Sequence, residues 1–418
     1  MTRERLSICY AVPGHNLLHS AGPTRNVLSL AEALSPWADV TVAFRKVLEP
    51  VSPERYEIVE IHPGQARSRH SVDDGALRDM TVWEFISYLR SVRRFVRERA
   101  HTYDILLEKS WLLTGYMSSI CQSRGLPAVV VSNIVRVWNE PLQKPQDFLK
   151  YLRHLIAAKM TGRYLRRSSL IIAETEELKV ALVERARISG DRIEVVGLGV
   201  NRTLFRPLQQ MPARMELGIS RNATVLLYVG VLDRTHDLMP VLEALSKRCD
   251  SELELHIVGD GELRPLYEEK AQSCRQNVFF HGRVPHKTVP KYIAAADLCL
   301  APYNPSSFHH GEVAYSSLKI PEYKACGRPV VSVPSGHILK LIEDGVSGYL
   351  FNNEVKNWLN FCQHFPSRER LKSMGEAALG TAGSHGWEKT ARAYLSLCEG
   401  TVRKQNLNKI RIALGHTN

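Results

Sequence analysis

Two side chains in the last third of the chain, Lys319 and Glu322, are spaced to act together. They lie three residues apart in a segment with helical periodicity, so both fall on one helical face. A carboxylate there can accept hydrogen bonds from both hydroxyls of a ribose, and free N–H groups at a helix start can bind phosphate. The pattern therefore predicts a nucleotide site, with an ordinary surface ion pair as the alternative.

Two glycine-containing loops follow predicted strands. Gly22 lies between the first strand, Leu6–Val12, and a helical run, where a glycine lets backbone N–H groups approach a phosphate. Gly259-Asp260-Gly261-Glu262 also follows a strand, but it lacks the third glycine of a dinucleotide fingerprint. Gly22 is therefore a candidate phosphate contact, the alternative being an ordinary loop glycine, and 259–262 is interpreted as a tight turn.

Other patterns are interpreted as carrying no chemistry of their own. Ser316 and Lys319 form an S-x-x-K pair without the companion motifs of serine acyl-enzymes. His309, His310 and Glu312 have metal-binding side chains, but adjacent loop histidines rarely face one ion. No Asp-x-Asp occurs, which removes a common magnesium–nucleotide clamp. We therefore predict no metal site.

Composition bounds the partners and the compartment. The 418 residues include 55 Lys and Arg against 43 Asp and Glu, a net charge of +12, which suits an anionic partner. No recognition motif accompanies the charge, so nucleic acid is disfavoured. The eight cysteines form no C-x-x-C pair, which is typical of reduced core cysteines. With no export signal and no apolar run near the ~18 residues of a membrane span, we predict a cytoplasmic protein.

Short β-rich runs alternate with helical runs through most of the chain, which predicts an α/β protein with mainly parallel sheets. We predict two Rossmann-like domains, residues 1–205 and 206–385, facing a central cleft. Ligands of such domains bind at the carboxyl ends of the strands. Residues 386–418 form a further segment with apolar residues at helical spacing.

Eight short segments follow one another in the order of a known family's motifs. They are the loop around Gly22, Gly199–Pro207, Tyr228–Leu232, Ile257–Gly261, Val278–Pro285, Ala294–Asp297, Ser317–Tyr323 and Asp344–Tyr349. In this order they resemble the family 4 glycosyltransferases, retaining nucleotide-sugar enzymes of the GT-B fold, and within them a subgroup with the donor motif SPLKxxEYMA. The resemblance implies a GT-B fold whose C-terminal helix, residues 386–418, crosses back to pack on the N-terminal domain.

The resemblance also implies a donor site on the C-terminal domain. Glu322 would hold the ribose of a UDP-, GDP- or dTDP-sugar, and Val284 with nearby backbone would contact the base. The residues implied to bind the donor are Gly22, Gly230, Arg234, His236, Val284, Ser316, Ser317, Leu318, Lys319 and Glu322. No cofactor and no metal are implied.

The chain departs from the family pattern at three positions. Many members have two glutamates, of which Glu322 matches the second and Ala314 takes the place of the first. Members also commonly have an Arg and a Lys at the positions of Val231 and His236. Val231 and Ala314 favour an alternative hypothesis, a binding or scaffold protein that kept the fold and lost transfer. The retained Lys319 and Glu322 weigh against it.

Three residues are expected to act in catalysis. Glu108 and Asn133 end two N-terminal strands, where the subgroup tends to have acceptor-side groups, and His236 would help to stabilise the leaving diphosphate. Capping of the strand ends is the alternative for the first two. The sequence shows no obvious carboxylate nucleophile, so attack from the front face is what the resemblance implies.

Two basic stretches bear on the acceptor. Residues 141–170 carry seven Lys and Arg against one Asp, and residues 87–101 carry five Arg against one Glu. Apolar residues interleave with Lys150, Arg153 and Lys159, which is typical of a helix on an anionic membrane surface or of a core-packing helix with a solvated face. We expect a peripheral enzyme at the inner face of the membrane that extends a surface polysaccharide or glycolipid, with a soluble small-molecule acceptor as the alternative.

Overall fold

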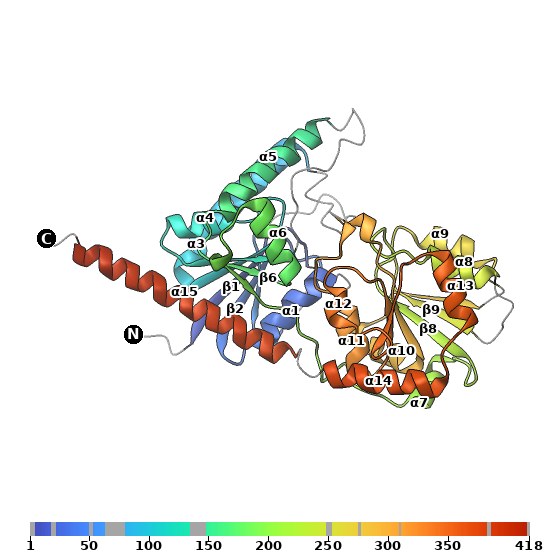
Figure 1. The fold of residues 1–418 in the computed structure, drawn as a ribbon. Helices are drawn as coiled ribbons and strands as arrows, with labels where there is room; N and C mark the ends of the chain where they lie inside the picture. The colour runs from blue at the N-terminus through green and yellow to red at the C-terminus, as the bar shows by residue number, and fades with distance from the viewer. Residues whose placement is uncertain are drawn as a thin grey trace. The chain divides into compact units, whose positions relative to one another are not determined.

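The computed structural model describes residues 5–17, 22–49, 53–62, 80–133, 148–247, 253–274, 277–308, 311–382 and 386–415. The chain forms two compact units (Figure 1). Unit 1 comprises Met1–Leu198 with Trp387–Asn418, and unit 2 comprises Gly199–Gly386. Val200 and Phe205 lie in the apolar core of unit 2. The chain therefore enters unit 2 a few residues before the boundary that we expected at 205.

Unit 1 is built on a seven-stranded parallel sheet in the order β3-β2-β1-β4-β5-β6-β7. The strands are β1 (Leu6–Val12), β2 (Ala38–Phe44), β3 (Glu57–Glu60), β4 (Ile105–Lys109), β5 (Ala128–Ser132), β6 (Ile171–Ala173) and β7 (Ile193–Val195). Its helices before the last are α1 (Gly22–Leu34), α3 (Val82–Arg99), α4 (Tyr116–Ser123), α5 (Phe148–Leu165) and α6 (Glu176–Ala186). Every residue of β4 and β5 is buried, because helices cover both faces of the sheet.

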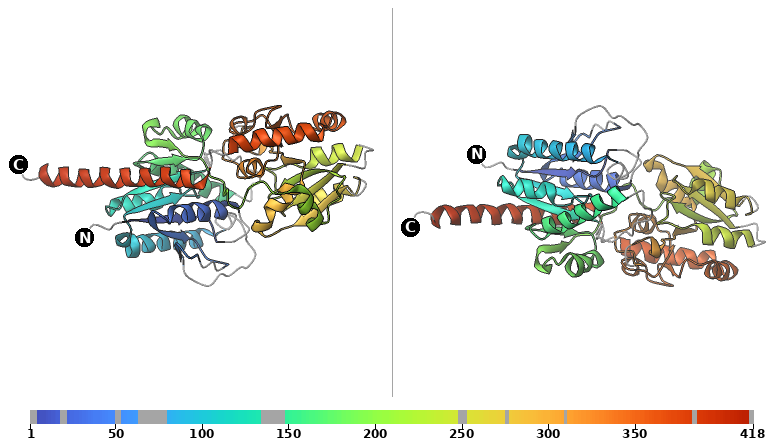
Figure 2. Two further views of the ribbon diagram at one scale, coloured as in Figure 1. Left: turned by 90° about the horizontal axis from the view of Figure 1, so that it is seen from below. Right: turned by 90° about the horizontal axis from the view of Figure 1, so that it is seen from above.

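The last helix, α15 (Trp387–Gly415), packs against α1 in unit 1 (Figures 1 and 2). Its buried residues include Trp387, Ala391, Tyr394 and Cys398, which recur at helical spacing. The Arg392 guanidinium lies 4.8 Å from the centroid of the Trp37 ring. The expectation that the C-terminal helix returns to the N-terminal fold is confirmed.

Unit 2 is built on a six-stranded parallel sheet in the order β10-β9-β8-β11-β12-β13. The strands are β8 (Thr224–Val229), β9 (Leu253–Val258), β10 (Val278–Gly282), β11 (Leu298–Ala301), β12 (Val330–Ser332) and β13 (Gly348–Leu350). The helices are α7 (Gln210–Leu217), α8 (Met239–Lys247), α9 (Arg264–Ala271), α10 (Val289–Ala295), α11 (Lys319–Ala325), α12 (Ile338–Leu341), α13 (Val355–Gln363) and α14 (Arg368–Ala382). The strand order reverses between β8 and β11, the place where such sheets bind ligands.

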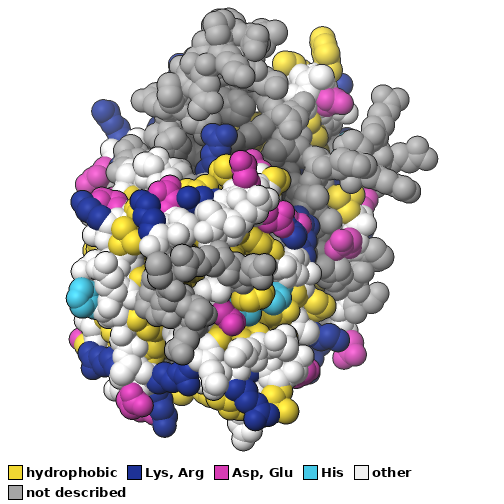
Figure 3. Space-filling model, turned by 90° about the vertical axis from the view of Figure 1, so that its right-hand side faces the viewer, with side chains coloured by type: hydrophobic (Ala, Val, Ile, Leu, Met, Phe, Trp, Pro, Cys, Tyr) yellow, Lys and Arg dark blue, Asp and Glu magenta, His cyan; other side chains and the backbone are white. Residues whose placement is uncertain are grey.

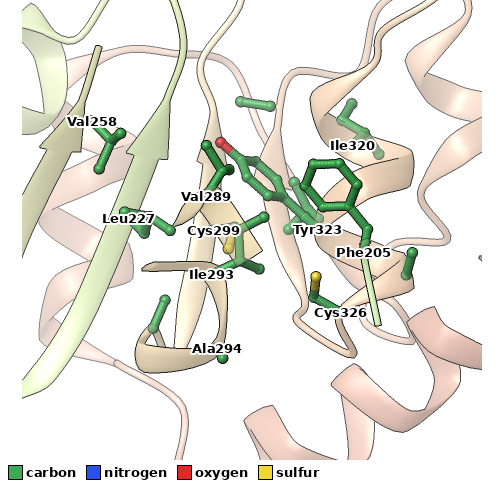
Figure 4. Close-up of a cluster of buried hydrophobic side chains, with 14 of the residues drawn as sticks. Phe205, Leu227, Val258, Val289, Ile293, Ala294, Cys299, Ile320, Tyr323 and Cys326 are labelled. Carbon is green, nitrogen blue, oxygen red and sulfur yellow. The ribbon is translucent and has the colours of Figure 1, made fainter. Parts of the chain in front are cut away.

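Apolar side chains of β8 alternate between two cores of unit 2. Leu227 packs with Phe205, Ile320 and Tyr323 on one face, and Leu226 packs with other residues on the opposite face (Figure 4). The Tyr323 hydroxyl accepts a hydrogen bond from the Val229 N–H at 2.9 Å. This contact ties α11 to the end of β8.

A buried ion pair closes the base of this core. Arg214 of α7 and Asp297, which precedes β11, are 1% and 9% exposed, and their side chains meet at 2.8 Å. Arg214 also donates to the carbonyl oxygen of Ala295, and Asp297 accepts from the N–H of Val225. The Ala294–Asp297 segment of the sequence pattern therefore has a structural role.

The cysteines, the surface charge and the hydrophobicity of the helices bear on the compartment and the partners. The seven described cysteines are all buried and free. Acidic and basic side chains are interspersed on the face drawn in Figure 3, so the net charge of +12 is not gathered there. In the part of the chain that the structure describes, no helix combines the length and the apolar character needed to span a membrane.

Candidate functional site

The loop that follows β8 lies against the loop that follows β9, and glycines make this approach feasible. A Cβ atom on Gly261 would lie 2.2 Å from the Leu232 carbonyl oxygen. Gly230 has a φ of +157°, and a Cβ there would lie 2.7 Å from Lys319 Nζ and 2.9 Å from the Tyr228 hydroxyl oxygen. Residues 259–262 connect β9 to α9, in agreement with the tight turn that we expected. Gly230 therefore leaves the space in front of Lys319 open.

Lys319, the first residue of α11, rests on two aromatic rings. Its Nζ lies 4.4 Å from the ring centroid of Tyr228 and 5.6 Å from that of Tyr303, and it donates a hydrogen bond to the Tyr228 hydroxyl at 3.3 Å. Burial lowers the pKa of Lys319 to about 7, and the charges of Asp233 and Glu322 oppose this shift. The site therefore holds a cation that a bound anion can stabilise.

His236 packs on the same two rings, at 6.0 Å from Tyr228 and 4.9 Å from Tyr303 between centroids. Its Nδ1 lies 3.1 Å from an oxygen of Asp233 and 2.9 Å from the Thr235 hydroxyl. Burial, and after it the charge of Lys319, lowers the pKa of His236 to about 4, so the imidazole is neutral at pH 7. Its Nε2 is buried and has no hydrogen-bond partner among the described residues.

Glu322 also belongs to α11, one turn after Lys319, and its side chain is 17% exposed. Its carboxylate lies 3.8 Å from Nε2 of His286, which the sequence analysis did not identify. Among the described residues no ion pair joins Glu322 to Lys319. The structure therefore does not contain the surface ion pair that was the alternative to a nucleotide site. Val284 is partly buried against the core beside this region.

Ser317, which lies just before α11, holds the Tyr303 ring in place. The Ser317 side-chain oxygen accepts hydrogen bonds from the Tyr303 hydroxyl at 2.6 Å and from the Ile320 N–H at 3.3 Å. Ser316 is buried, and Leu318 precedes the first helical residue. Arg234 is different, because its side chain is 82% exposed and pairs with Glu262 at 3.7 Å.

Unit 2 therefore brings together most of the donor residues expected from the sequence, around Lys319. Three further residues of this region were not among the expected ones: Tyr228 and Tyr303, whose rings support Lys319, and Asp233, which faces His236. A signal was present for the tyrosines, since each lies at or just after the carboxyl end of a strand next to the reversal of strand order.

In unit 1, Glu108 is fully buried and its carboxylate is enclosed by donors. It accepts hydrogen bonds from the indole N–H of Trp111 at 2.6 Å and from the backbone N–H groups of Gly115 and Ser118 at 2.9 Å and 2.6 Å. Burial raises the pKa of Glu108 against these hydrogen bonds. This geometry favours a structural role, in which Glu108 fixes the start of α4, over the acceptor contact that we expected.

Gly22 and Asn133, the other two residues of unit 1 that we expected at the site, lie at the start of a helix and just after a strand. Gly22 is the first residue of α1. Asn133 follows β5, is partly buried, and its N–H donates to the Ser110 hydroxyl at 3.2 Å. His309, His310 and residues 141–147 lie outside the described residues. Within the described ranges no cluster of three His, Cys, Asp or Glu side chains is arranged to hold a metal ion.

Residues 223–364 match a family model described as "Glycosyl transferases group 1". The chain is 26% identical over 335 residues to the D-inositol 3-phosphate glycosyltransferase of Segniliparus rotundus, covering 78% of this chain and 72% of that protein. It is also similar to the solved structure of WaaG, a glycosyltransferase involved in lipopolysaccharide biosynthesis, with a TM-score of 0.71, 16% identity, and coverage of 94% of this chain and 100% of WaaG.

A further solved structure, Anabaena HepE in complex with UDP-glucose, matches with a TM-score of 0.67 and 17% identity, over 94% of this chain and 100% of HepE. These likenesses extend over almost the whole chain, and the expected GT-B fold is confirmed.

Proposed function

We propose that this protein moves a sugar from a nucleotide-sugar to a hydroxyl acceptor, with retention of configuration and without a metal ion. Its similarity to glycosyltransferases in family and in sequence supports the class of reaction. The observation that carries the proposal is the cluster of Lys319, His236 and Glu322 at the reversal of strand order in unit 2. It offers one cation, one buried imidazole and one carboxylate around the space that Gly230 leaves open.

Each group of the cluster has a proposed part in donor binding. Glu322 accepts hydrogen bonds from the ribose hydroxyls, and Lys319 and His236 contact the diphosphate together with backbone N–H groups of Ser316–Lys319. Val284 and the adjacent backbone contact the base. Arg234, which is exposed, adds positive charge at the entrance of the site. The binding of UDP-glucose by HepE, a protein of similar fold, supports a donor of this class.

The proposed chemistry depends on stabilising the leaving diphosphate. Negative charge develops on the diphosphate as the bond to the sugar breaks, and Lys319 is held in position for it by two aromatic rings. Because the ammonium is partly desolvated, its interaction with a phosphate oxygen is stronger than it would be in water. The acceptor hydroxyl then attacks from the face that the diphosphate leaves. Asn133 of unit 1 remains a proposed acceptor-side position, and Gly22 remains a proposed contact of the donor phosphate.

For the acceptor we propose a growing surface polysaccharide or a glycolipid, reached from the cytoplasmic side of the membrane. Helix α5 supports this proposal, because Leu152, Ile156 and Met160 are 40%, 54% and 39% exposed and recur every four residues. Lys159 and Arg163 of the same helix are also exposed. An apolar stripe beside basic residues suits the surface of an anionic membrane. WaaG, with its part in lipopolysaccharide biosynthesis, has a similar fold.

A second acceptor class is a soluble phosphorylated polyol. The relative in Segniliparus rotundus is named for D-inositol 3-phosphate, and the identity to it extends over 78% of this chain. Transfer to inositol 3-phosphate in solution, with no transfer to lipid-linked acceptors, would favour this second candidate.

Donor binding is tested by calorimetry against UDP-, GDP- and dTDP-sugars. One donor should bind and be hydrolysed slowly, whereas a scaffold protein should bind none. Glu322→Ala should weaken donor binding and reduce turnover by about tenfold or more, because charge-assisted hydrogen bonds to the ribose are lost. Glu216→Ala, which removes a carboxylate paired with Lys291 on the surface, is the matched control. Unchanged kinetics for Glu322→Ala would remove Glu322 from the site.

Membrane binding is tested by sedimentation with anionic vesicles at low and high salt. The wild-type protein should sediment at low salt and be released at high salt. A variant with Ile156→Asp and Lys159→Glu should remain in solution, while Arg185→Glu, an exposed charge reversal on α6, should behave as wild type. Absence of binding at low salt would count against the membrane-bound acceptor.

A further inference from the structure

His236 is hydrogen-bonded through Nδ1 to the Asp233 side chain, while its other ring nitrogen is buried without a partner among the described residues. Donor binding alone does not explain this arrangement. Thr235 donates to Asp233 at 2.6 Å, and Nδ1 of His236 faces both side chains. A ring nitrogen that faces a carboxylate carries the hydrogen, so in the neutral imidazole Nε2 bears the lone pair. Nε2 is therefore a buried acceptor, without a partner among the described residues.

While the His236 imidazole is neutral, its Nε2 is a poor partner for a phosphate. The lone pair of Nε2 would face phosphate oxygens that are themselves acceptors, and this contact is repulsive. Once Nε2 is protonated, the same contact becomes a charge-assisted hydrogen bond. His236 and Lys319 rest on the same two rings, so an anion that binds Lys319 comes close to His236.

We propose that Asp233 is a positioning residue that enables His236 to take up one proton from solvent when the donor diphosphate binds. The proposal rests on the proposed donor site and adds a proton to its binding step. The proton binds Nε2, is shared with a phosphate oxygen, and returns to solvent when the nucleoside diphosphate leaves. The Asp233 carboxylate at Nδ1 stabilises the imidazolium that results.

The surroundings of His236 explain why protonation waits for the ligand. Burial of the ring is the main reason why the pKa of His236 is low and the free imidazole is neutral. Lys319 of α11 adds a cation that disfavours a second positive charge, and the Asp233 carboxylate favours it. Among the described residues, the other titratable groups found against the ring or its backbone are phenols. Tyr228 and Tyr303 contact the ring, and the Tyr267 hydroxyl donates a hydrogen bond to the His236 carbonyl oxygen. A bound diphosphate brings two negative charges, which outweigh the repulsion from Lys319.

The test is proton uptake measured by calorimetry at pH 6 in buffers of different ionisation enthalpy, with UDP-glucose, GDP-mannose and dTDP-glucose as probes. The phosphates of a nucleotide-sugar do not titrate near this pH. Lys319, with a pKa of about 7, is already about nine-tenths protonated, so it contributes about 0.1 proton. The wild-type protein should take up close to one proton with the probe that binds.

Variants distinguish the role of His236, which takes up the proton, from that of Asp233, which stabilises the imidazolium. His236→Gln keeps a hydrogen-bond donor at this place but cannot titrate, so uptake should fall to about 0.1 proton. Asp233→Asn should reduce uptake and weaken binding by about tenfold, the equivalent of one unit in the pKa of the bound imidazole. Glu216→Gln, a carboxylate on the surface of the same unit, should leave uptake unchanged.

Each outcome decides between the proposals. Binding by the wild-type protein without proton uptake would overturn the inference and leave the donor site intact. Full uptake in Asp233→Asn would overturn the positioning role of Asp233. No binding of any probe would contradict the proposed function itself.

Discussion

Gly230 and Gly259 lie backbone against backbone, so closely that a Cβ atom on Gly259 would be 1.8 Å from the Gly230 carbonyl oxygen. The Gly230 N–H donates to Val258 at 2.9 Å, immediately before Gly259. Gly259 also has a φ of +135°, which side chains other than glycine rarely adopt. The position of the loop in front of Lys319 therefore depends on Gly259, which is not among the residues proposed to bind the donor.

Gly259→Ala should lower the free energy of unfolding by at least about 2 kcal/mol and abolish donor binding, because the Gly230 loop must move. Thermal unfolding and donor calorimetry measure the two effects. Gly380→Ala in α14 is the control, since a Cβ there meets nothing within 4 Å. That control should gain up to about 1 kcal/mol from the higher helix propensity of alanine. Equal stability of the two variants would contradict the close approach.

The ion pair between Arg214 and Asp297 should be essential to unit 2. Asp297→Asn leaves the Arg214 guanidinium buried with no counter-charge from this residue, which should cost about 3–5 kcal/mol in urea unfolding. Glu216→Gln breaks an exposed pair with Lys291 and should cost less than about 1 kcal/mol. A loss below 1 kcal/mol for both variants would show that Asp297 is not structural.

Lys319 should make stability depend on pH. Its pKa is lowered from 10.5 to about 7, so between these values the unfolded chain binds a proton that the folded chain does not. Stability must then rise with pH above 7, and the cost of burying the cation is fully present below pH 7. Relative to Lys319→Met, the wild-type protein should gain up to about 1.4 kcal/mol per pH unit in urea unfolding.

Lys287→Met, at an exposed lysine of the same unit, should show the wild-type pH dependence. Parallel curves for the wild-type protein and Lys319→Met between pH 7 and 9 would mean that the Lys319 ammonium is not desolvated.

Removing α15 should damage unit 1. A chain that ends at Gly386 loses the buried side chains of Trp387, Tyr394 and Cys398, and should melt at a lower temperature. A chain that ends at Gln405 is the control, because residues 406–411 are exposed. Among them, Lys409 donates a hydrogen bond to the Gly125 carbonyl oxygen at 3.1 Å. If the chain that ends at Gly386 melted at the same temperature as the full chain, the packing of α15 on α1 would be contradicted.

Periodicity and turn residues were enough to predict the alternating strands and helices, because buried parallel strands are short apolar runs between glycine and polar loops. Strand β1 has the bounds that we expected, Leu6–Val12. The positions of Lys319 and Glu322 on one helix were also predicted correctly. These features depend on neighbours in the sequence.

The rest of the site depends on neighbours in space. Tyr228 and Tyr303 come together under Lys319 because β8 pairs with β11, which is not the next strand along the chain. For Glu108 the sequence left two alternatives open for a related reason, since a carboxylate at a strand end can face a ligand or the N–H groups of the following helix. Only the packing of α4 shows that it does the latter.

The parallel bridge between Val200 and Gly386 brings the two ends of unit 2 side by side. Unit 2 is therefore an insertion between β7 and α15 of unit 1, and each unit finishes at a different moment of synthesis. At roughly 5–20 residues per second, unit 2 is complete on the ribosome before α15 has emerged. Through that interval, the surface of unit 1 that α15 later covers, which includes α1, lacks the helix that buries it in the finished protein.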